Sequence, residues 1–283
     1  MKRALNAQAG AILFYCVTSH AVATPLEKGE ASNFFDEEQK MATATAFTSK
    51  LNKKENLAEG TMGFYFAKPA GLQFKPGQYM DLTLIDPPET DAEGNIRSFS
   101  IASAPEDEYL LFATRMRDTA FKRFLRTTAA DTEVKMEGPM GSFTLHNNSS
   151  KAAVFLAGGI GITPFSSIIR HAARAKLPHR LHLFYSNRRP EDAAFMSILQ
   201  ELEKENPNFK FIPSVSEMNK STQTWNGETG FINQEMLARH LPGLQGPIYY
   251  IAGPPALVTA MRQMLVAAGV DEDDVRAEEF SGY

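Results

Sequence analysis

The stretch AVFLAGGIGITPFSSIIRHA, residues 153–172, most constrains how this chain can fold. Its apolar run Ala153–Ala157 has the length of a buried strand, and Pro164 suits the first turn of a following helix. The glycine turn 158–161 between them allows positive φ, and it lets backbone N–H groups approach a phosphate at the helix N-terminus. A turn that only packs the helix onto the strand would explain the same glycines. The stretch alone therefore leaves phosphate binding open.

After Lys151 the sequence alternates strand patterns with helix patterns. Strands fit Ala153–Ala157, Arg180–Tyr185, Phe209–Val215 and Pro247–Ile251. Helices fit Phe165–Ala175, Glu191–Asn206, Asn233–His240 and Pro255–Ala268. This alternation predicts an α/β fold with a doubly wound parallel sheet. Such sheets bind ligands at the carboxyl ends of their strands, where the glycine turn lies, so the location favours a nucleotide.

The preceding part of the chain reads as antiparallel β structure. Strands fit Thr61–Ala67, Tyr79–Ile85, Ser98–Ala102, Tyr109–Arg115 and Glu133–Glu137, at the spacing expected of a barrel. One helix, Ala120–Arg126, follows Asp118 and Thr119, and either residue can cap it. Turn residues fill the segment 138–151. We therefore expect a β barrel domain over residues 42–148 and an α/β domain over residues 149–283.

Composition excludes several classes of function. The net charge of −4 gives no reason to expect a nucleic acid or an anionic membrane surface as partner. The single cysteine, Cys16, excludes an internal disulfide and a cysteine-ligated iron–sulfur cluster within this chain. The six histidines lack metal-ligand spacing, so we expect no metal. No run reaches the roughly 20 apolar residues of a membrane span.

Residues 1–41 carry no core-forming pattern. Lys2 and Arg3 precede the apolar stretch Ala9–Val17, and an A-x-A sequence follows at Ala21–Ala23, which is typical of a signal peptide. A disordered leader, or an upstream extension of the reading frame before Met41, would explain the segment as well. We expect a leader that joins neither core.

The stretch RSFSIAS, which begins at Arg97, offers a second anion site. Arg97 can bind a diphosphate through two hydrogen bonds, Phe99 can lie on a flat ring, and Ser100 can donate a hydrogen bond to that ring. A surface arginine and a core phenylalanine on an ordinary strand would explain the same residues. Lys122 adds a cation at a helix start. Because no Ser-His-Asp set and no close carboxylate pair is evident, we expect a cofactor to carry the chemistry.

The residues Arg97–Ser100 also resemble the flavin motif R-x-[FY]-[ST] of the ferredoxin–NADP reductase superfamily. Further motifs of that superfamily occur in its order, namely FKPGQY, GPMGSFTL, AGGIGITPF, YSNRRPEDAAF, YYIAGPPALVTAM and EEFSGY. They span residues 45–283. The resemblance implies a six-stranded antiparallel Greek-key barrel that binds flavin, followed by a domain that binds NADH or NADPH.

The resemblance also implies roles for residues of the barrel half. Arg97 would bind the flavin diphosphate, Phe99 would pack on the isoalloxazine, and Ser100 would lie near flavin N5. The other residues that it places at the flavin are Ser98, Thr114, Arg115, Met116, Phe121, Lys122, Gly141 and Ser142.

The nucleotide half receives its roles from the same resemblance. The NAD(P)H diphosphate would lie on Gly158, Gly159, Gly161, Thr163 and Pro164, the adenosine ribose or its 2′-phosphate at Ser186 and Arg188, and the nicotinamide beside Gly253, Pro254 and Met261. At the C-terminus, Phe280 would cover the flavin, with Tyr283 as the alternative cover, and Glu278 would form a proton path with Ser100. Ala252 stands where many relatives have a cysteine, which puts the rate of hydride transfer in doubt.

The function implied is that of an FAD-dependent NAD(P)H oxidoreductase that passes a hydride to flavin and then electrons to a separate acceptor. That acceptor is a ferredoxin, a flavodoxin-like protein, an oxygenase component or a small molecule. The alternative is a non-catalytic regulatory or assembly subunit that keeps the fold. FAD is expected over FMN, and NADPH over NADH because Arg188 is present and no acidic residue stands at Ser186 or Asn187. We expect a cytoplasmic protein, since NAD(P)H is supplied there, with the periplasm as the alternative.

Overall fold

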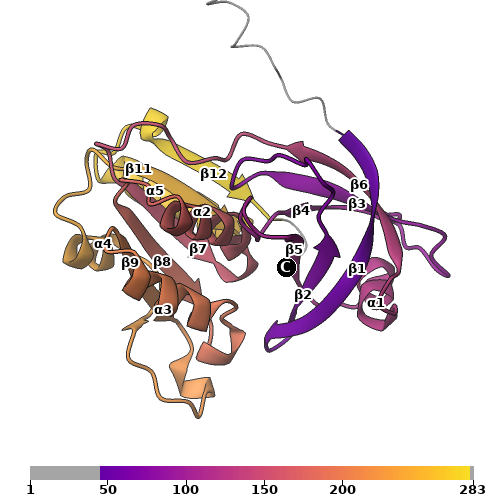
Figure 1. Cartoon of the computed structure of the whole chain (residues 1–283). Helices are drawn as coiled ribbons and strands as arrows, with labels where there is room; N and C mark the ends of the chain where they lie inside the picture. Colours follow the sequence, from indigo (N-terminus) through magenta and orange to yellow (C-terminus); the bar gives the residue numbers. More distant parts are fainter. Residues whose placement is uncertain (1–44, 281–283) are drawn as a thin grey trace, which may run out of the picture. The chain divides into compact units, whose positions relative to one another are not determined.

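The computed structural model describes residues 45–280, which form two six-stranded sheets with their helices (Figure 1). The leader 1–41, its Cys16 and the C-terminal Tyr283 lie outside the described residues. The roles expected of them stay predictions.

The first sheet is antiparallel. Its strands are β1 (Thr45–Ala58), β2 (Thr61–Ala67), β3 (Tyr79–Leu84), β4 (Ile96–Ser100), β5 (Tyr109–Arg115) and β6 (Glu133–Met140), in the spatial order β4-β3-β6-β1-β2-β5. Just beyond β4, the amide of Ala102 donates to the carbonyl of Leu111 on β5 at 2.8 Å. The amide of Leu111 in turn donates to the hydroxyl of Ser103 at 3.0 Å. The two outer strands thus meet, and the sheet closes into the predicted barrel.

The barrel closes around large apolar side chains. Alternate residues of a strand point to opposite faces, so each strand supplies a row of inward-facing residues. Leu51, Phe66, Leu82, Phe112 and Met136 are among those buried in this core. Helix α1 (Ala120–Thr127) covers one end of the barrel and contributes Phe121 and Leu125 to the same core.

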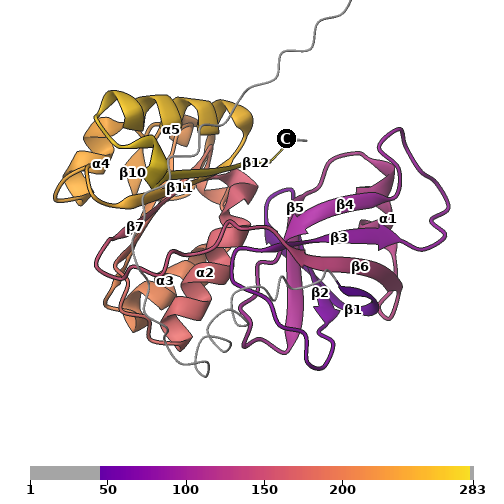
Figure 2. The same ribbon diagram turned by 90° about the horizontal axis from the view of Figure 1, so that it is seen from above.

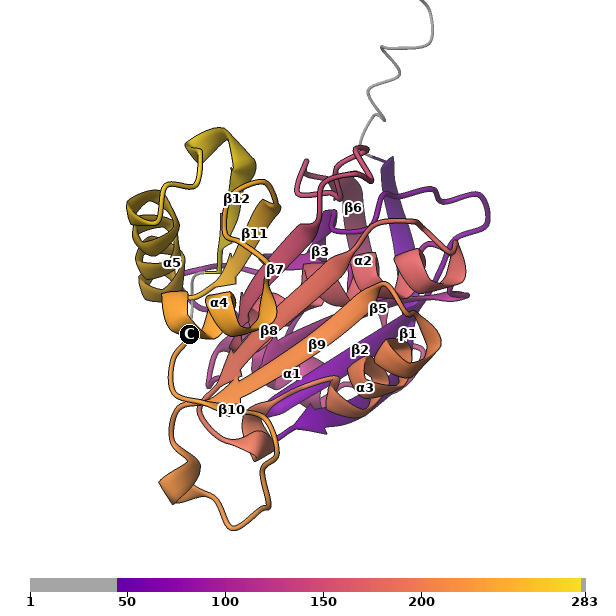
Figure 3. The ribbon, with the colours of Figure 1, turned by 90° about the vertical axis from the view of Figure 1, so that its left-hand side faces the viewer.

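The second sheet is parallel throughout. Its strands are β7 (Ala153–Gly158), β8 (Leu181–Asn187), β9 (Phe209–Val215), β10 (Glu228–Thr229), β11 (Ile248–Gly253) and β12 (Val275–Glu279), in the order β10-β9-β8-β7-β11-β12 (Figure 3). The helices α2 (Ile162–Arg174) and α3 (Met196–Glu205) cover one face, and α4 (Gln234–His240) and α5 (Pro255–Ala267) cover the other (Figure 2). Short 3₁₀ turns occur at Gly159–Gly161, Pro190–Asp192, Met218–Lys220 and Glu272–Asp274. The predicted fold class is confirmed.

The central strand β7 shows why this sheet needs helices on both faces. All six of its residues are buried. Ala153, Phe155 and Ala157 pack toward α2 and α3. Val154 and Leu156 pack toward α4 and α5. A strand with two buried faces reads as a continuous apolar run, as this one does.

Several elements differ from the sequence-based expectation, and β10 was not predicted at all. Strand β1 was not predicted, because its segment KLNKKENLA is mostly polar and only its Leu51 is fully buried. Strand β4 begins at Ile96 and ends at Ser100, two residues earlier than predicted. Helix α3 begins at Met196 rather than at Glu191, because a 3₁₀ turn and the left-handed Phe195 (φ 64°) precede it. At α1 the capping residue is Thr119, whose hydroxyl accepts from the amide of Lys122.

Helix α2 holds the end of β4 against the parallel sheet. The hydroxyl of Ser166 donates to the carbonyl of Ala102 at 3.0 Å, and the hydroxyl of Ser167 donates to the carbonyl of Ser103 at 2.6 Å. These carbonyls follow β4 directly, and α2 begins directly after the glycine turn. The two segments with predicted ligand contacts are therefore joined by buried hydrogen bonds.

We expect Ser167→Ala to destabilise the protein. The substitution leaves the buried carbonyl of Ser103 without this donor, which costs about 1–3 kcal/mol and lowers Tm by at least about 2 °C in a chain of this size. Thermal denaturation followed by circular dichroism measures the change. Ser150→Ala, which removes an exposed hydroxyl, serves as the control. Equal Tm values for the two variants would show that the contact contributes nothing.

Candidate functional site

A carboxylate occupies the anion site that Arg97 was predicted to form. The guanidinium of Arg97 lies over the ring of Phe121, with 5.3 Å from Cζ to the ring centroid. Its Nη2 is 3.1 Å from Oδ1 of Asp91, and Oδ2 of Asp91 accepts from the backbone N–H of Ala120 at 3.0 Å. One carboxylate thus bridges a guanidinium and the N-terminus of α1. This donor set binds an anion and would also suit a phosphate.

Lys122 adds a third positive group to this site. Its Nζ donates to the carbonyl of Arg115 at 2.8 Å. Burial lowers the pKa of Lys122, and the nearby charges of Arg117 and Arg97 lower it further. Lys122 is therefore close enough to Arg97 for their charges to interact. The guanidinium of Arg115 points elsewhere, with its Nη2 3.6 Å from Oδ1 of Asp192 in the second half of the chain.

Strand β4 presents Phe99 next to this anion site. The ring of Phe99 is half-buried and lies 5.8 Å from that of Phe121 and 6.4 Å from that of Phe112. Ser100, paired with Tyr79 on β3, is 95% buried, given an exposed fraction of 5%. The hydroxyl of Ser98 donates to Asp81. Thr114 and Met116, the remaining predicted residues of β5 and its end, are respectively buried and half-buried.

The glycine turn packs tightly against the end of β11. A Cβ on Gly161 would lie 2.2 Å from the carbonyl oxygen of Ala252, and one on Gly158 would lie 2.6 Å from Leu257. Gly159 has φ of 52°, the left-handed region that favours glycine. Packing against β11 thus explains Gly161, and packing against Leu257 of α5 explains Gly158, without a ligand. Their predicted contact with the NAD(P)H diphosphate stays a prediction.

The other predicted residues of this turn begin helix α2. The hydroxyl of Thr163 donates to the carbonyl of Ile160 at 3.1 Å, and Pro164 lies buried in the first turn. The amides at this helix start lie at the carboxyl edge of the parallel sheet, between β7 and β11. The edge is where parallel sheets bind their ligands.

Phe280 lies beside the turn that follows β11. Its backbone N–H donates to the carbonyl of Gly253 at 3.0 Å, and its half-buried ring packs against the core that contains Ala252. Pro254 follows as the capping residue of α5. Met261 lies on α5 and is buried in the core that this helix forms with α4 and the sheet. Of the residues predicted beside the nicotinamide, Gly253 and Pro254 are thus next to Phe280.

A cavity of about 610 Å³ brings the two halves of the chain together. Gly141, Ser142 and Phe143 line it from the segment after β6, and Arg276 and Glu278 line it from β12. Arg276 fixes this junction, since its Nη1 donates to the carbonyl of Thr144 at 3.0 Å. Burial raises the pKa of the Glu278 carboxyl to about 7. The sequence predicted Glu278, Gly141 and Ser142 separately, and the fold places them around one cavity.

Two adjacent arginines after β8 have different environments. Arg189 makes ion pairs with Asp192 at 2.9 Å and Glu59 at 3.2 Å, and these contacts raise its pKa. Arg188 is exposed, and within residues 45–280 its guanidinium makes no hydrogen bond or ion pair. Ser186, the other predicted ribose contact, is buried at the end of β8. Arg188 is thus the cation available to a ligand at this edge.

Three residues with a place in this site were missed from the sequence. For Asp91, the run of acidic residues just before Arg97 was the sequence feature that could have indicated a partner of this arginine. Phe231 is 75% exposed and comes directly after Gly230, whose amide donates to Val215 at the end of β9. The two-residue strand β10 before it is too short to leave a sequence pattern. Nothing in the sequence marked Arg276 as the residue that fixes β12.

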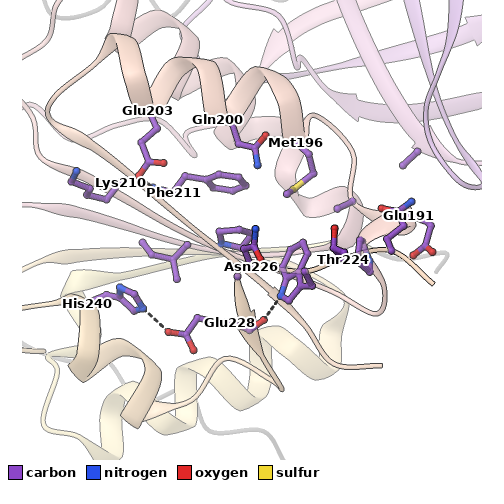
Figure 4. A pocket seen from close by; sticks show the side chains of 18 of the residues that line it. Glu191, Met196, Gln200, Glu203, Lys210, Phe211, Thr224, Asn226, Glu228 and His240 are labelled. Carbon is purple, nitrogen blue, oxygen red and sulfur yellow. Dashed lines mark hydrogen bonds and ion pairs between the residues drawn. The ribbon is translucent and has the colours of Figure 1, made fainter. Parts of the chain in front are cut away.

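A second, larger cavity of about 1200 Å³ lies along the outer edge of β9 (Figure 4). None of the predicted site residues lines it. Glu203 of α3 accepts from the amide of Phe211 at 2.9 Å, and Pro213 has no amide hydrogen to offer. The indole N–H of Trp225 donates to the carbonyl of Glu228 at 2.7 Å. These contacts protect an edge strand from pairing with another chain.

Two further classes of site were sought in the described part of the chain. Within residues 45–280 no group of three His, Cys, Asp or Glu residues is placed to hold a metal ion. Over the same residues no helix is both long and apolar enough to cross a membrane.

The chain is similar in sequence to known reductase proteins. Residues 155–263 match the family model of the oxidoreductase NAD-binding domain. The chain is 29% identical over 227 residues to the reductase component of propane 2-monooxygenase from Rhodococcus jostii, covering 76% of this chain and 57% of that one. It is 28% identical over 223 residues to the glycine betaine monooxygenase reductase subunit of Chromohalobacter salexigens, covering 78% and 60%. The chain therefore spans less than two thirds of these relatives.

Solved structures share the fold. A cytochrome P450 reductase from Amycolatopsis aligns with a TM-score of 0.72 and 24% identity, covering 84% of this chain and 70% of that one. A ferredoxin NADP⁺ reductase from Neisseria gonorrhoeae, solved with bound FAD and NADP, aligns with a TM-score of 0.69 and 19% identity, covering 83% and 98%. The chain therefore carries a segment that matches the oxidoreductase NAD-binding domain, resembles reductase components in sequence, and shares its two-sheet fold with a ferredoxin NADP⁺ reductase.

Proposed function

We propose that the chain is a flavin-dependent NAD(P)H oxidoreductase. Residues 42–148 would hold FAD, and residues 149–283 would hold NADPH or NADH. The observation that carries the proposal is the cavity where Gly141 and Ser142 of the first half meet Glu278 of the second. A hydride donor and a hydride acceptor that are bound by different halves must meet at such a junction. Relatives named as reductase components support the same conclusion.

The barrel residues fit the phosphates of a flavin nucleotide. The carboxylate of Asp91 supports this fit, because it accepts from both Arg97 and the N–H of Ala120, and the same converging donors would suit a phosphate. Phe99 would offer its ring to the isoalloxazine, and Ser100 would lie near the reacting nitrogen. When bound, FAD would supply hydride acceptance and release of electrons singly or in pairs.

Glu278 would hold a proton at the junction. Its pKa of about 7 means that both protonation states are populated at neutral pH, which suits a group that takes up or releases a proton. Ser100 would connect this carboxyl to the flavin. Phe280, fixed through the carbonyl of Gly253, would cover the flavin ring on the side that the nicotinamide must reach.

The carboxyl edge of the parallel sheet would hold NAD(P)H. The helix start after the glycine turn would bind the diphosphate, and the exposed Arg188 would bind the 2′-phosphate of NADPH. The exposed ring of Phe231, beyond the end of β10, offers a face on which the adenine can stack. The nicotinamide would then lie beside Gly253 and Pro254.

The electrons would leave to a separate acceptor. We propose an oxygenase component, because the relatives named above are reductase components or subunits of monooxygenases. A ferredoxin, a flavodoxin-like protein or a small molecule is the alternative. We place the reaction in the cytoplasm, where NAD(P)H is supplied.

We expect the purified chain to be yellow and to be bleached by NAD(P)H under anaerobic conditions. Arg97→Ala is expected to be nearly colourless, because the loss of one charge-assisted contact costs about 1.5–3 kcal/mol, or more than tenfold in FAD affinity. The absorbance of flavin relative to protein measures its content. Arg126→Ala, which removes an exposed cation from the same helix α1, is the control and should stay yellow. A parent protein that binds no flavin would favour the non-catalytic subunit instead.

We expect Glu278→Gln to slow flavin reduction by at least about tenfold, because a positioned proton-transfer group contributes that much or more. In the parent the stopped-flow rate should change around pH 7, and in the variant it should not. Glu279→Gln, on the exposed neighbour, is the control. Identical pH profiles in all three proteins would exclude a role for Glu278 in proton transfer.

The same substitution has a stability effect that does not depend on flavin. Burial raises the pKa of Glu278 from its ordinary value of 4.5 to about 7 in the folded chain, so ionisation there opposes folding. Below pH 4.5 the parent and Glu278→Gln should be equally stable. As the pH rises toward 7, the parent should lose stability relative to the variant, and the difference should stay constant above pH 7.

We expect Arg188→Ala to lose affinity for NADPH and to keep its affinity for NADH. One guanidinium–phosphate contact is worth about tenfold in kcat/KM or more. Steady-state kinetics with both nucleotides measure the preference, and Arg180→Ala, at the exposed residue just before β8, is the control. A parent that strongly prefers NADH, with no change in Arg188→Ala, would contradict the assignment.

A further inference from the structure

The loop between β3 and β4 neutralises the anion site with its own carboxylates. Residues 86–95, DPPETDAEGN, contain four acidic residues and no lysine or arginine. Nη2 of Arg97 is 2.7 Å from Oε2 of Glu93 and 3.1 Å from Oδ1 of Asp91. Nη1 of Arg97 donates to the carbonyls of Glu93, Gly94 and Ile96, at 2.8, 3.2 and 2.7 Å. The side chain of Arg97 is only 17% exposed, and the loop and Ile96 provide acceptors for both terminal nitrogens of its guanidinium.

Asp91 also takes the donor that helix α1 offers. Its Oδ2 accepts from the N–H of Ala120, while its Oδ1 accepts from the N–H of Glu93 at 3.0 Å and from Arg97. Partial burial raises the pKa of Asp91, but these hydrogen bonds outweigh it and leave the pKa lowered. The carboxylate is therefore ionised at neutral pH and occupies the donors that a phosphate would need.

A second contact fastens the loop to α1. Glu89 binds Arg123 through two hydrogen bonds, Oε1 to Nε at 2.8 Å and Oε2 to Nη2 at 3.0 Å. The loop thus holds the start of α1 at two points, through Glu89 and through Asp91. The first contact does not involve the anion site, so the loop can release Arg97 and stay attached through Arg123.

We infer that residues 91–93 act as an internal competitor of the flavin phosphates. Asp91 and Glu93 bind Arg97 and the amide of Ala120 before flavin arrives, and they must leave these donors when the diphosphate binds. This inference rests on the proposed flavin function. It goes beyond that function by naming the loop carboxylates as residues that determine the affinity for flavin. An apparent affinity falls by the fraction of time that a site is competent, so a site that is closed about ten times as often as it is open binds about tenfold more weakly.

The test compares FAD binding to the apoprotein of the parent and of the double variant Asp91→Asn/Glu93→Gln. Asparagine keeps an oxygen that can accept from the N–H of Ala120, so this contact with the start of α1 is retained. Quenching of flavin fluorescence gives Kd for FAD and for riboflavin, which has no phosphate. We expect the double variant to bind FAD about tenfold more tightly and to bind riboflavin as the parent does. Asp86→Asn/Glu133→Gln removes two exposed carboxylates that do not contact Arg97, and it should match the parent.

Equal or weaker FAD binding in the double variant would overturn the inference. If the double variant does not fold, Glu93→Gln alone should still tighten FAD binding, because it removes an exposed carboxylate that contacts Arg97 and keeps the contact of Asp91 with Ala120. If the parent binds no flavin, the proposed function fails and inorganic pyrophosphate decides the inference separately. At constant ionic strength, pyrophosphate should raise the Tm of the double variant more than that of the parent. An equal effect on both would overturn the competition as well.

Discussion

The close approach of two backbone segments at the carboxyl edge of the parallel sheet fixes the geometry of the candidate site. The glycine turn after β7 lies against the end of β11, and a single methyl group on Gly161 would overlap the carbonyl of Ala252. This contact sets where α2 begins. Because the hydroxyls of Ser166 and Ser167 on α2 bind the chain just after β4, the same contact sets where the barrel lies.

The sequence predicted the elements of this fold well where apolar patterns were strong. β2, β5 and β9 have the predicted limits, since each is a regular run of apolar or aromatic residues. The prediction from sequence failed where tertiary contacts determine the backbone conformation. Polar β1 becomes a long strand because it pairs with β2 and β6, and α3 starts late because Phe195 takes a left-handed conformation to enter the core.

The sequence predicted which residues belong to the candidate site better than it predicted which groups those residues contact. Motif spacing found Arg97, Glu278 and Ser142, but a motif cannot tell which groups a side chain meets. The glycines illustrate the difference: the pattern suggested room for a phosphate, and the coordinates give Gly161 a backbone neighbour. Arg97 illustrates it again, because its partners Asp91 and Glu93 belong to a loop without a motif. Which groups a side chain contacts depends on residues that are distant in the sequence, and local sequence patterns do not reveal those contacts.

The loop carboxylates reconcile two demands on one cluster of cations. Arg97, Arg117 and Lys122 lie close enough that the arginine charges lower the pKa of Lys122, so without a counter-anion they would repel one another and oppose folding. Asp91 and Glu93 supply that counter-anion inside the chain. The interaction that stabilises the protein before flavin binds is then the one that flavin must displace. At the other end of the site, Arg188 has no such partner within residues 45–280, so a phosphate can bind there without breaking an ion pair. A cofactor that is bound once can accommodate a slow displacement, whereas a substrate that exchanges at every turnover needs an open cation.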